Sequence, residues 1–178
     1  MKNKILRIGK NALAIWGGIS LIGIILILGY LAYSTSIGNK TVENKATTSD
    51  VRFVLNWCGL GDQRIEKVLN SYESGRSFTG DYLDAYAIEI SNVTELELKN
   101  NEGWHRLDSL PKVLSDAVEL ANGWQYQIPW FPKIDELNPE SVYVYPWSIY
   151  CHGTDPTGTE LIFVIPNDKM VYYLGTKM

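Results

Sequence analysis

The most pronounced pattern along the chain is an uninterrupted apolar run near its beginning. Residues 12–33 contain no charged side chain across 22 positions. As a helix rising about 1.5 Å per residue, this run would extend about 33 Å, enough to cross a hydrocarbon core of roughly 30 Å. The run therefore predicts a transmembrane helix. A cleaved signal peptide is the alternative, although its apolar region is normally only about 7–15 residues long.

Basic residues are distributed unequally around the apolar run. Lys2, Lys4, Arg7 and Lys10 precede it with no acidic residue among them, and the segment that follows mixes basic with acidic side chains. Because Lys and Arg are retained on the cytoplasmic side, we expect residues 1–11 to form a cytoplasmic tail. The chain is then a single-pass protein of the cell inner membrane whose C-terminal part lies in the periplasm or an equivalent extracytoplasmic space.

The polar and apolar pattern divides the exported part into two regions. Residues 34–50 have no aromatic side chain and only two large aliphatic ones, so they predict a flexible tether. Residues 51–178 have the composition of a folded domain. At its start, residues 51–58 alternate as a strand would, but a short helix fits the same residues, and the periodicity does not decide between them.

Two stretches of the domain show a helical spacing of apolar residues. Ile65, Val68, Leu69 and Tyr72 recur at intervals of three and four, which predicts a helix over this stretch. A stronger apolar stripe runs through residues 110–121 and is followed by a stop signal at Asn-Gly. We therefore expect two helices here, besides any formed by residues 51–58.

The remaining pattern is that of strands. Residues 84–91 alternate, and residues 95–98 read as a solvated strand edge. Residues 141–151, 160–165 and 169–174 predict a C-terminal antiparallel meander, in which the entirely apolar second strand has both faces covered. The fold class is therefore α+β: an N-terminal transmembrane helix, then two to three helices packed on one face of an antiparallel sheet of three to five strands.

The two cysteines, Cys58 and Cys151, are the first candidates for chemistry. In an oxidising compartment a single pair is most simply a disulfide, and two separate buried thiols are the alternative. His152 follows Cys151 directly, but successive strand residues point to opposite faces, so we expect Cys151 to face the core and His152 the solvent. The pair therefore does not predict a thiol nucleophile and its base.

Charge narrows the class of partner. Of the 16 basic residues, four precede the apolar run, whereas all 20 acidic residues follow it, so the exported part has a formal charge of −8. Attraction to nucleic acid or to an anionic membrane surface is not expected, and a basic protein partner is favoured. Metal-binding, nucleotide-binding and hydrolase motifs are lacking in the sequence, so we expect no metal, no small-molecule cofactor and no catalytic residue.

Aromatic residues concentrate in residues 123–132, where Pro129 and Pro132 oppose a helix. Two interpretations stay open for these rings: they close over the core, or some remain exposed as anchors of a protein interface. On the second interpretation, the partner-binding candidates are Trp124, Tyr126, Trp130 and Phe131.

The function expected from these patterns is binding rather than catalysis. The sequence fits a membrane-anchored extracytoplasmic binding protein, and an immunity protein that captures a secreted toxin is the most specific form of that hypothesis. An accessory or assembly subunit of a cell-envelope complex is one alternative, since Gly17, Gly18 and Ser20 give the apolar helix a small-residue face. An envelope hydrolase with an unrecognised site, using a carboxylate pair such as Asp81 and Asp84, is the other.

Overall fold

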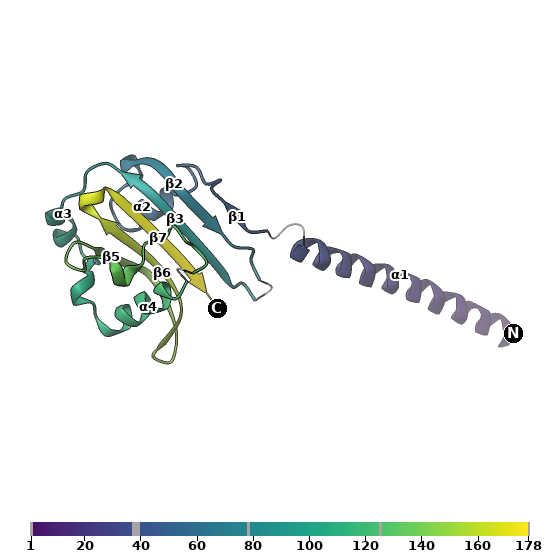
Figure 1. Cartoon of the computed structure of the whole chain (residues 1–178). Coiled ribbons are helices and arrows are strands. Elements are labelled where there is room, and N and C mark those ends of the chain that lie inside the picture. Colours follow the sequence, from purple (N-terminus) through teal and green to yellow (C-terminus); the bar gives the residue numbers. More distant parts are fainter. Residues whose placement is uncertain (1, 37–39, 78, 125, 178) are drawn as a thin grey trace. The chain divides into compact units, whose positions relative to one another are not determined.

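A computed structural model describes residues 2–36, 40–77, 79–124 and 126–177 of the chain. Two compact units, residues 1–40 and residues 41–178, make up the molecule. The first contains helix α1, and the second contains a sheet with helices (Figure 1). The elements in chain order are α1 (Lys2–Ser36), β1 (Val42–Glu43), α2 (Arg52–Trp57), η1 (Asp62–Arg64), β2 (Ile65–Glu73), β3 (Tyr82–Ile90), α3 (Glu95–Asn100), β4 (His105–Arg106), η2 (Leu107–Ser109), α4 (Lys112–Asn122), η3 (Ile134–Glu136), β5 (Tyr143–His152), β6 (Asp155–Ile165), η4 (Pro166–Asp168) and β7 (Met170–Lys177).

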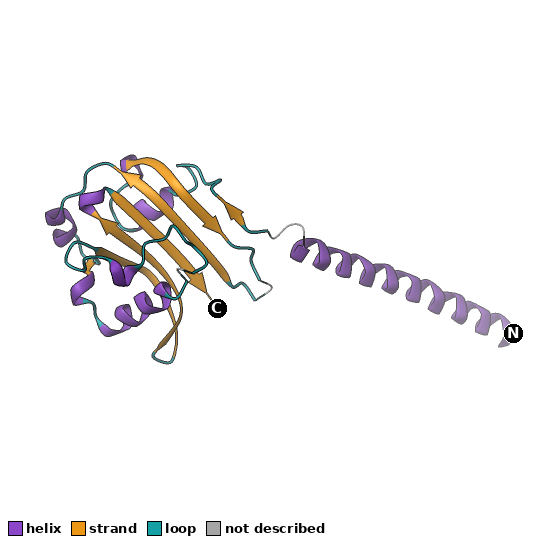
Figure 2. Ribbon diagram, in the orientation of Figure 1, coloured by secondary structure: helices purple, strands orange, loops and turns teal. Residues whose placement is uncertain are grey.

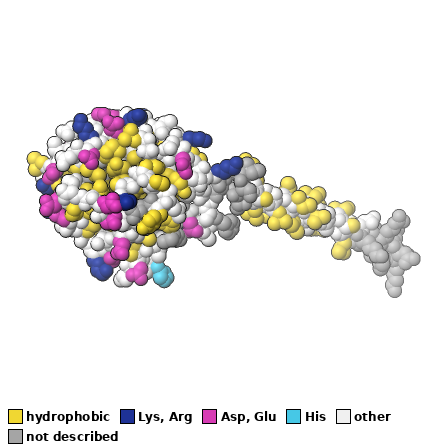
Figure 3. Space-filling model, viewed as in Figure 1, with side chains coloured by type: hydrophobic (Ala, Val, Ile, Leu, Met, Phe, Trp, Pro, Cys, Tyr) yellow, Lys and Arg dark blue, Asp and Glu magenta, His cyan; other side chains and the backbone are white. Residues whose placement is uncertain are grey.

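Helix α1 contains the predicted apolar run. Its residues Leu13–Tyr33 are long and apolar enough to cross a membrane, and none of them is buried within the structure. Apolar side chains are accordingly seen along the surface of this helix in Figure 3. The structure confirms one apolar helix of membrane-spanning length near the N-terminus, a property that a membrane anchor and a signal sequence share.

A seven-stranded sheet forms the second unit, in the order β1-β2-β3-β7-β6-β5-β4. Every neighbouring pair of strands is antiparallel, and the helices of this second unit lie against the sheet (Figure 2). The α+β class and the C-terminal meander β5-β6-β7 are confirmed, whereas the number of strands exceeds the predicted three to five. Strand β3 pairs with β7, although the two are far apart in the sequence. This central contact joins the first half of the domain to its last strand.

Helices cover both faces of the sheet, not one as the sequence predicted. Within β6, the buried residues Ile162 and Val164 pack in a cluster with α2, α3 and Trp104. Their neighbours Leu161, Phe163 and Ile165 pack in a second cluster with α4 and the chain that follows it. Because successive strand residues point to opposite faces, the two clusters are the two sides of one sheet. The prediction that the apolar strand is covered on both faces is therefore confirmed.

The predicted helix around Ile65–Tyr72 is wrong, because these residues form β2. Two register shifts, between Ile65 and Lys67 and between Val68 and Asn70, interrupt the ladder with β3. Such irregularities add residues to one strand and change the parity of the side chains that follow. Ile65 and Val68 therefore pack against the same cluster although they are three residues apart, and this spacing imitates a helix.

The predicted strand edge at residues 95–98 is also wrong, because helix α3 begins there. The Thr94 hydroxyl caps this helix by accepting a hydrogen bond of 3.3 Å from the backbone N–H of Glu97. Thr-x-x-Glu is the sequence of a capping box, a signal that the alternation of Glu and Leu obscured. Residues 52–57, whose sequence fits either a strand or a short helix, form helix α2.

Part of the predicted tether is paired with the domain. Val42 and Glu43 form β1 on the edge of β2, and the Ser71 hydroxyl accepts hydrogen bonds of 3.1 Å from the backbone N–H groups of Lys45 and Ala46. Residues 37–39 lie outside the described residues. The compact second unit thus includes residues from Thr41 onward.

Candidate functional site

The four aromatic residues predicted to bind a partner occupy different environments. Phe131 is buried, with its ring 6.0 Å from that of Phe163 on the sheet. Trp124 and Trp130 are half-buried against the α4 cluster, and Tyr126 is 86% exposed. Phe131 thus serves the core, and only Tyr126 presents its ring fully to solvent. The structure does not gather the four into one exposed patch.

The predicted disulfide between Cys58 and Cys151 is not formed. Cys58 is buried behind α2, where its thiol donates to the backbone oxygen of Leu55 at 3.4 Å. Cys151 is exposed in the β5–β6 hairpin. One thiol is therefore part of the core while the other lies at the surface, and a reaction between them would require one to leave its place.

The prediction that His152 faces the solvent is confirmed, whereas the prediction that Cys151 faces the core is wrong, because Cys151 is exposed as well. Strand β5 carries register shifts between Pro146 and Ser148 and between Tyr150 and Cys151. The first shift places an extra residue in β5 and so reverses the parity on which the prediction depended, whereas the second places its extra residue in β6. Ile149 accordingly packs on the α4 side, whereas Tyr145 packs on the α2 side.

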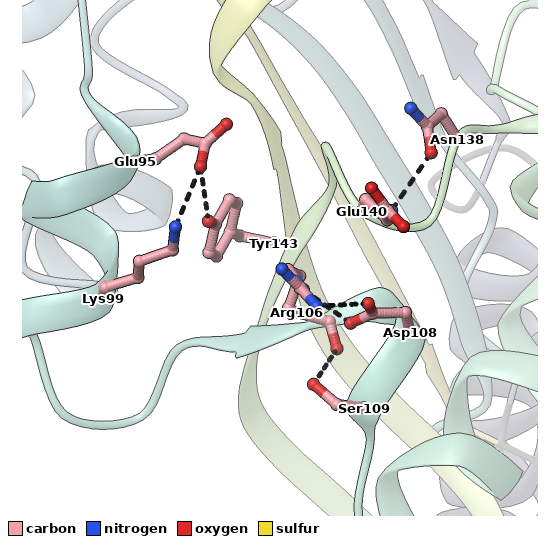
Figure 4. Close-up of polar contacts among 8 residues, drawn as sticks. All are labelled: Glu95, Lys99, Arg106, Asp108, Ser109, Asn138, Glu140 and Tyr143. Carbon is pink, nitrogen blue, oxygen red and sulfur yellow. Dashed lines mark hydrogen bonds and ion pairs between the residues drawn. The ribbon is translucent and has the colours of Figure 1, made fainter.

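A network of charged residues lies where α3, β4 and η2 meet β5 (Figure 4). Glu95 accepts hydrogen bonds from the Lys99 ammonium at 3.0 Å and from the Tyr143 hydroxyl at 3.3 Å. Arg106 forms a two-pronged ion pair with Asp108, whose carboxyl pKa it lowers. These charged groups already have partners and are substantially exposed. The network therefore connects neighbouring elements and is a poor candidate for a ligand-binding site.

A pocket on the α2 face combines aromatic walls with carboxylates. Its volume is about 370 Å³. We call it the acidic–aromatic pocket, and its lining residues are Phe53, Trp57, Arg76, Tyr82, Asp84, Tyr86, Glu160 and Tyr173. They come from α2, β3, β6, β7 and the β2–β3 connection, so the pocket exists only once the sheet is assembled.

Helix α2 supplies one wall of this pocket. Phe53 and Trp57 are four residues apart, which places them on one side of a helix, and their ring centroids are 4.4 Å apart. Phe53 meets the rings of Tyr86 and Tyr173 edge-on at 6.0 and 5.4 Å. The electron-rich faces of such rings attract cations.

The sheet supplies a row of acidic side chains. In the strand register, Glu73 lies opposite Asp84, Asp84 opposite Gly175, and Gly175 opposite Glu160. Gly175 has no side chain, and the Tyr173 hydroxyl lies so close to its Cα that an added methyl group would collide with it. Asp84 and Glu160 are thus held on either side of a position without a side chain.

Asp84 is the least satisfied group in the pocket. Its side chain is only 10% exposed, and its Oδ2 accepts a 2.6 Å ion-paired hydrogen bond from Arg76. Its Oδ1 is buried without a hydrogen-bond partner among the described residues. Burial raises the pKa of this carboxyl, and Glu73 and Glu160 raise it further, although Arg76 opposes them. A buried carboxylate oxygen without a partner is costly and is best relieved by a cationic donor.

Tyrosine hydroxyls engage the other two acids. Tyr82 donates to Glu160, and Tyr86 donates to Glu73 at 3.0 Å. Burial and the nearby carboxylates raise the pKa of both phenols, so they remain neutral donors. The acids therefore stay in place as a concentrated negative charge beneath the aromatic walls.

This arrangement suits the binding of an organic cation. The described residues contain no group of three His, Cys, Asp or Glu side chains placed to hold a metal ion. The volume lies at the low end of the roughly 300–1,000 Å³ typical of ligand pockets, which suits one side chain or a small molecule.

Sequence reasoning missed this site. The sequence indicates Asp84 only as a member of an acid pair with Asp81, and no local pattern indicates Glu160 or Arg76. The local signal that was available is Tyr82-x-Asp84-x-Tyr86, a polar and aromatic alternation that a strand places on one face.

Comparison of the chain with protein-family models, with curated proteins and with solved structures finds no match. The functional conclusion therefore depends on the site itself.

Proposed function

We propose that the chain is a membrane-anchored binding protein whose domain lies outside the cytoplasm and receives a basic protein partner at the acidic–aromatic pocket. The observation that carries this proposal is the carboxylate of Asp84, which is nearly buried beneath aromatic walls and has one oxygen without a hydrogen-bond partner in the described part of the chain. The basic residues before the apolar run support the orientation.

Charge supports the class of partner. The region after the apolar run carries 20 acidic residues against 12 basic ones, which accelerates encounter with a basic protein. The pocket gives such a partner a specific place, because a cation there gains both ion pairing and contact with rings.

A defined peptide tests this proposal. The full chain in detergent micelles is titrated with a decapeptide containing Lys and Arg and with an acidic decapeptide of the same length. We expect only the basic peptide to bind. The double substitution Asp84→Asn/Glu160→Gln removes two pocket charges and is expected to weaken binding about tenfold or more, as loss of charge-assisted hydrogen bonds does.

A matched double variant controls for net charge. Glu102 and Glu119 are exposed and lie outside the pocket, so Glu102→Gln/Glu119→Gln changes the charge equally. If both double variants weaken binding alike, attraction is diffuse and the pocket is not the site.

Neutralisation of a secreted toxin is the narrower form of the proposal, supported by the acidic charge and the membrane-spanning length of α1. Co-expression with toxins encoded by neighbouring genes tests it. Loss of lethality that depends on Asp84 is the expected result, and undiminished lethality of every such toxin would contradict it.

Asp84 and Glu160 also raise the alternative of a carboxylate-pair hydrolase. Such an enzyme needs one carboxyl group to reach the leaving group and the other to reach a water or the sugar. Here Arg76 holds Asp84, and Tyr82 holds Glu160. The engaged state of both acids favours binding over hydrolysis.

A further inference from the structure

We infer that the group received by the acidic–aromatic pocket is the guanidinium of a partner arginine, which takes the position on Asp84 that Arg76 holds in the free protein. This inference rests on the proposed function and names the group that the pocket recognises.

Arg76 shows how a guanidinium is held here. Its Nη2 lies 2.6 Å from Asp84 Oδ2, and its guanidinium carbon lies 4.3 Å from the centre of the Tyr82 ring. Ion pairing combined with stacking on a ring is characteristic of arginine, whereas the lysine ammonium is a compact point charge. The pocket is therefore shaped for a planar cation.

The hold of Arg76 on Asp84 is incomplete. The hydrogen bond of the pair joins a single guanidinium nitrogen to Oδ2, and Oδ1 has no partner among the described residues. A carboxylate can accept two parallel N–H bonds from one guanidinium. A guest arginine that approaches with both prongs satisfies the second oxygen and thereby gains an advantage over Arg76.

The surroundings of Arg76 allow this exchange. Its side chain is 53% exposed, in the connection between β2 and β3. The turn that follows has hydrogen bonds of its own: the Ser77 hydroxyl donates to the Asp81 carboxylate at 2.9 Å, and the backbone N–H of Ser77 donates to the Asp81 carbonyl at 3.0 Å. Displacement of the Arg76 side chain therefore leaves the turn its own hydrogen bonds.

Three blocked tripeptides test the inference: Gly-Arg-Gly, Gly-Lys-Gly and Gly-citrulline-Gly, each titrated calorimetrically into the full chain in detergent micelles. We expect the arginine peptide to bind about tenfold more tightly than the lysine peptide, since only a guanidinium can donate two parallel hydrogen bonds to the Asp84 carboxylate. Citrulline keeps the shape of arginine without its charge, so we expect no measurable binding.

Arg76→Gln tests whether Arg76 competes with the partner arginine for Asp84 or instead helps to bind it. Removal of the internal competitor is expected to tighten binding of the arginine peptide several-fold, because less of the protein is occupied by its own side chain. Asp84→Asn is expected to abolish that binding. Weaker binding by Arg76→Gln, or a lysine peptide that binds as tightly as arginine, would overturn the inference.

A measurement on the unmutated chain covers the case in which a variant fails to fold. With ¹⁵N-arginine labelling, the side-chain Nε resonance of Arg76 is expected to move on addition of the arginine peptide and to stay in place with citrulline. An unchanged Arg76 resonance at saturation would show that no exchange occurs. If the basic decapeptide binds through the pocket without a preference for arginine, the proposed function stands and this inference falls.

Discussion

Trp57 and Trp147 stack face to face, with ring centroids 4.6 Å apart and ring planes inclined by 4°. Trp57 lies on α2 and lines the acidic–aromatic pocket, and Trp147 lies on β5 beside a register shift. The stack thus connects the helix that forms one wall to a strand that contributes no lining residue. Trp147 remains 44% exposed, so it supports the wall from the outside.

Trp147→Ala is expected to destabilise the domain by about 1 kcal/mol through loss of the stacked pair, beyond the lost apolar area. Tyr126→Ala is the control, because that ring is almost fully exposed, and its effect should stay within about 0.5 kcal/mol. Urea unfolding followed by far-UV circular dichroism measures both. Equal effects of the two substitutions would show that the stack contributes nothing.

Phe163→Ala tests the core between α4 and the sheet. Phe163 is fully buried on β6, and its ring meets that of Phe131 edge-on. Removal of a buried ring leaves a cavity and is expected to lower the free energy of unfolding by about 3–5 kcal/mol. Val113→Ala, at a half-exposed position on α4, should cost much less. A Phe163→Ala effect below about 1 kcal/mol would contradict the packing described.

The cysteines give a chemical test. Burial raises the pKa of Cys58 to about 12, so its thiol should remain protonated and unreactive in the folded protein. Iodoacetamide at pH 8 without reductant is expected to label Cys151 alone, and both thiols after unfolding in urea. Absence of any label under non-reducing conditions would instead indicate the disulfide that the structure does not form.

The pH dependence of stability tests the environment of Asp84. Its folded-state pKa is raised above the ordinary value, so its contribution to stability is fully present below the ordinary pKa and is lost as pH rises through the folded pKa. Relative to Asp84→Asn, the wild-type protein should therefore lose unfolding free energy as pH rises from about 4 towards neutrality. The opposite trend would mean that the Arg76 ion pair outweighs desolvation.

The pH dependence of binding has the opposite direction. A bound cation favours the ionised carboxyl, so affinity for the basic decapeptide should be full above the pKa of Asp84 and fall below it. Because that pKa is raised, the decline should begin at a higher pH than for an ordinary aspartate. The variant Asp84→Asn should lack this component.

Reporter fusions test the proposed orientation. Alkaline phosphatase fused to the C-terminus is expected to be active, because it folds outside the cytoplasm, whereas a green fluorescent protein exported through the same secretion pathway should stay dark. Fluorescence without phosphatase activity would place the domain in the cytoplasm. A shortened product lacking residues 1–33 would identify the apolar helix as a signal sequence.

Much of the fold was accessible from local patterns. The stripe of Leu114, Ala117, Val118 and Ala121 is a regular amphipathic repeat, and it forms α4 as predicted. The alternation of the last three strands likewise produced the meander. Prediction failed where strands are irregular, as in β2, because a register shift changes the parity that sequence patterns assume. Helix α3 was missed because its capping signal was outweighed by an apparent alternation.

The site was far less accessible, for a topological reason. Asp84 and Glu160 are brought together only because β3 pairs with β7 and β7 pairs with β6. These contacts join residues separated by most of the domain, and no local periodicity records them. The disulfide prediction was wrong for a similar reason. An oxidising compartment allows two thiols to pair, but the sequence does not show that Cys58, at the end of α2, is buried in the core.

The covering of the sheet on both faces has a consequence for how the domain can change. The side chains around Asp84 project to one side of the strands, and those beneath α4 project to the other. Since distant substitutions without shared partners usually have additive effects on stability, replacements on the two sides should act almost independently. Substitutions that change what the pocket recognises can therefore leave the packing beneath α4 undisturbed.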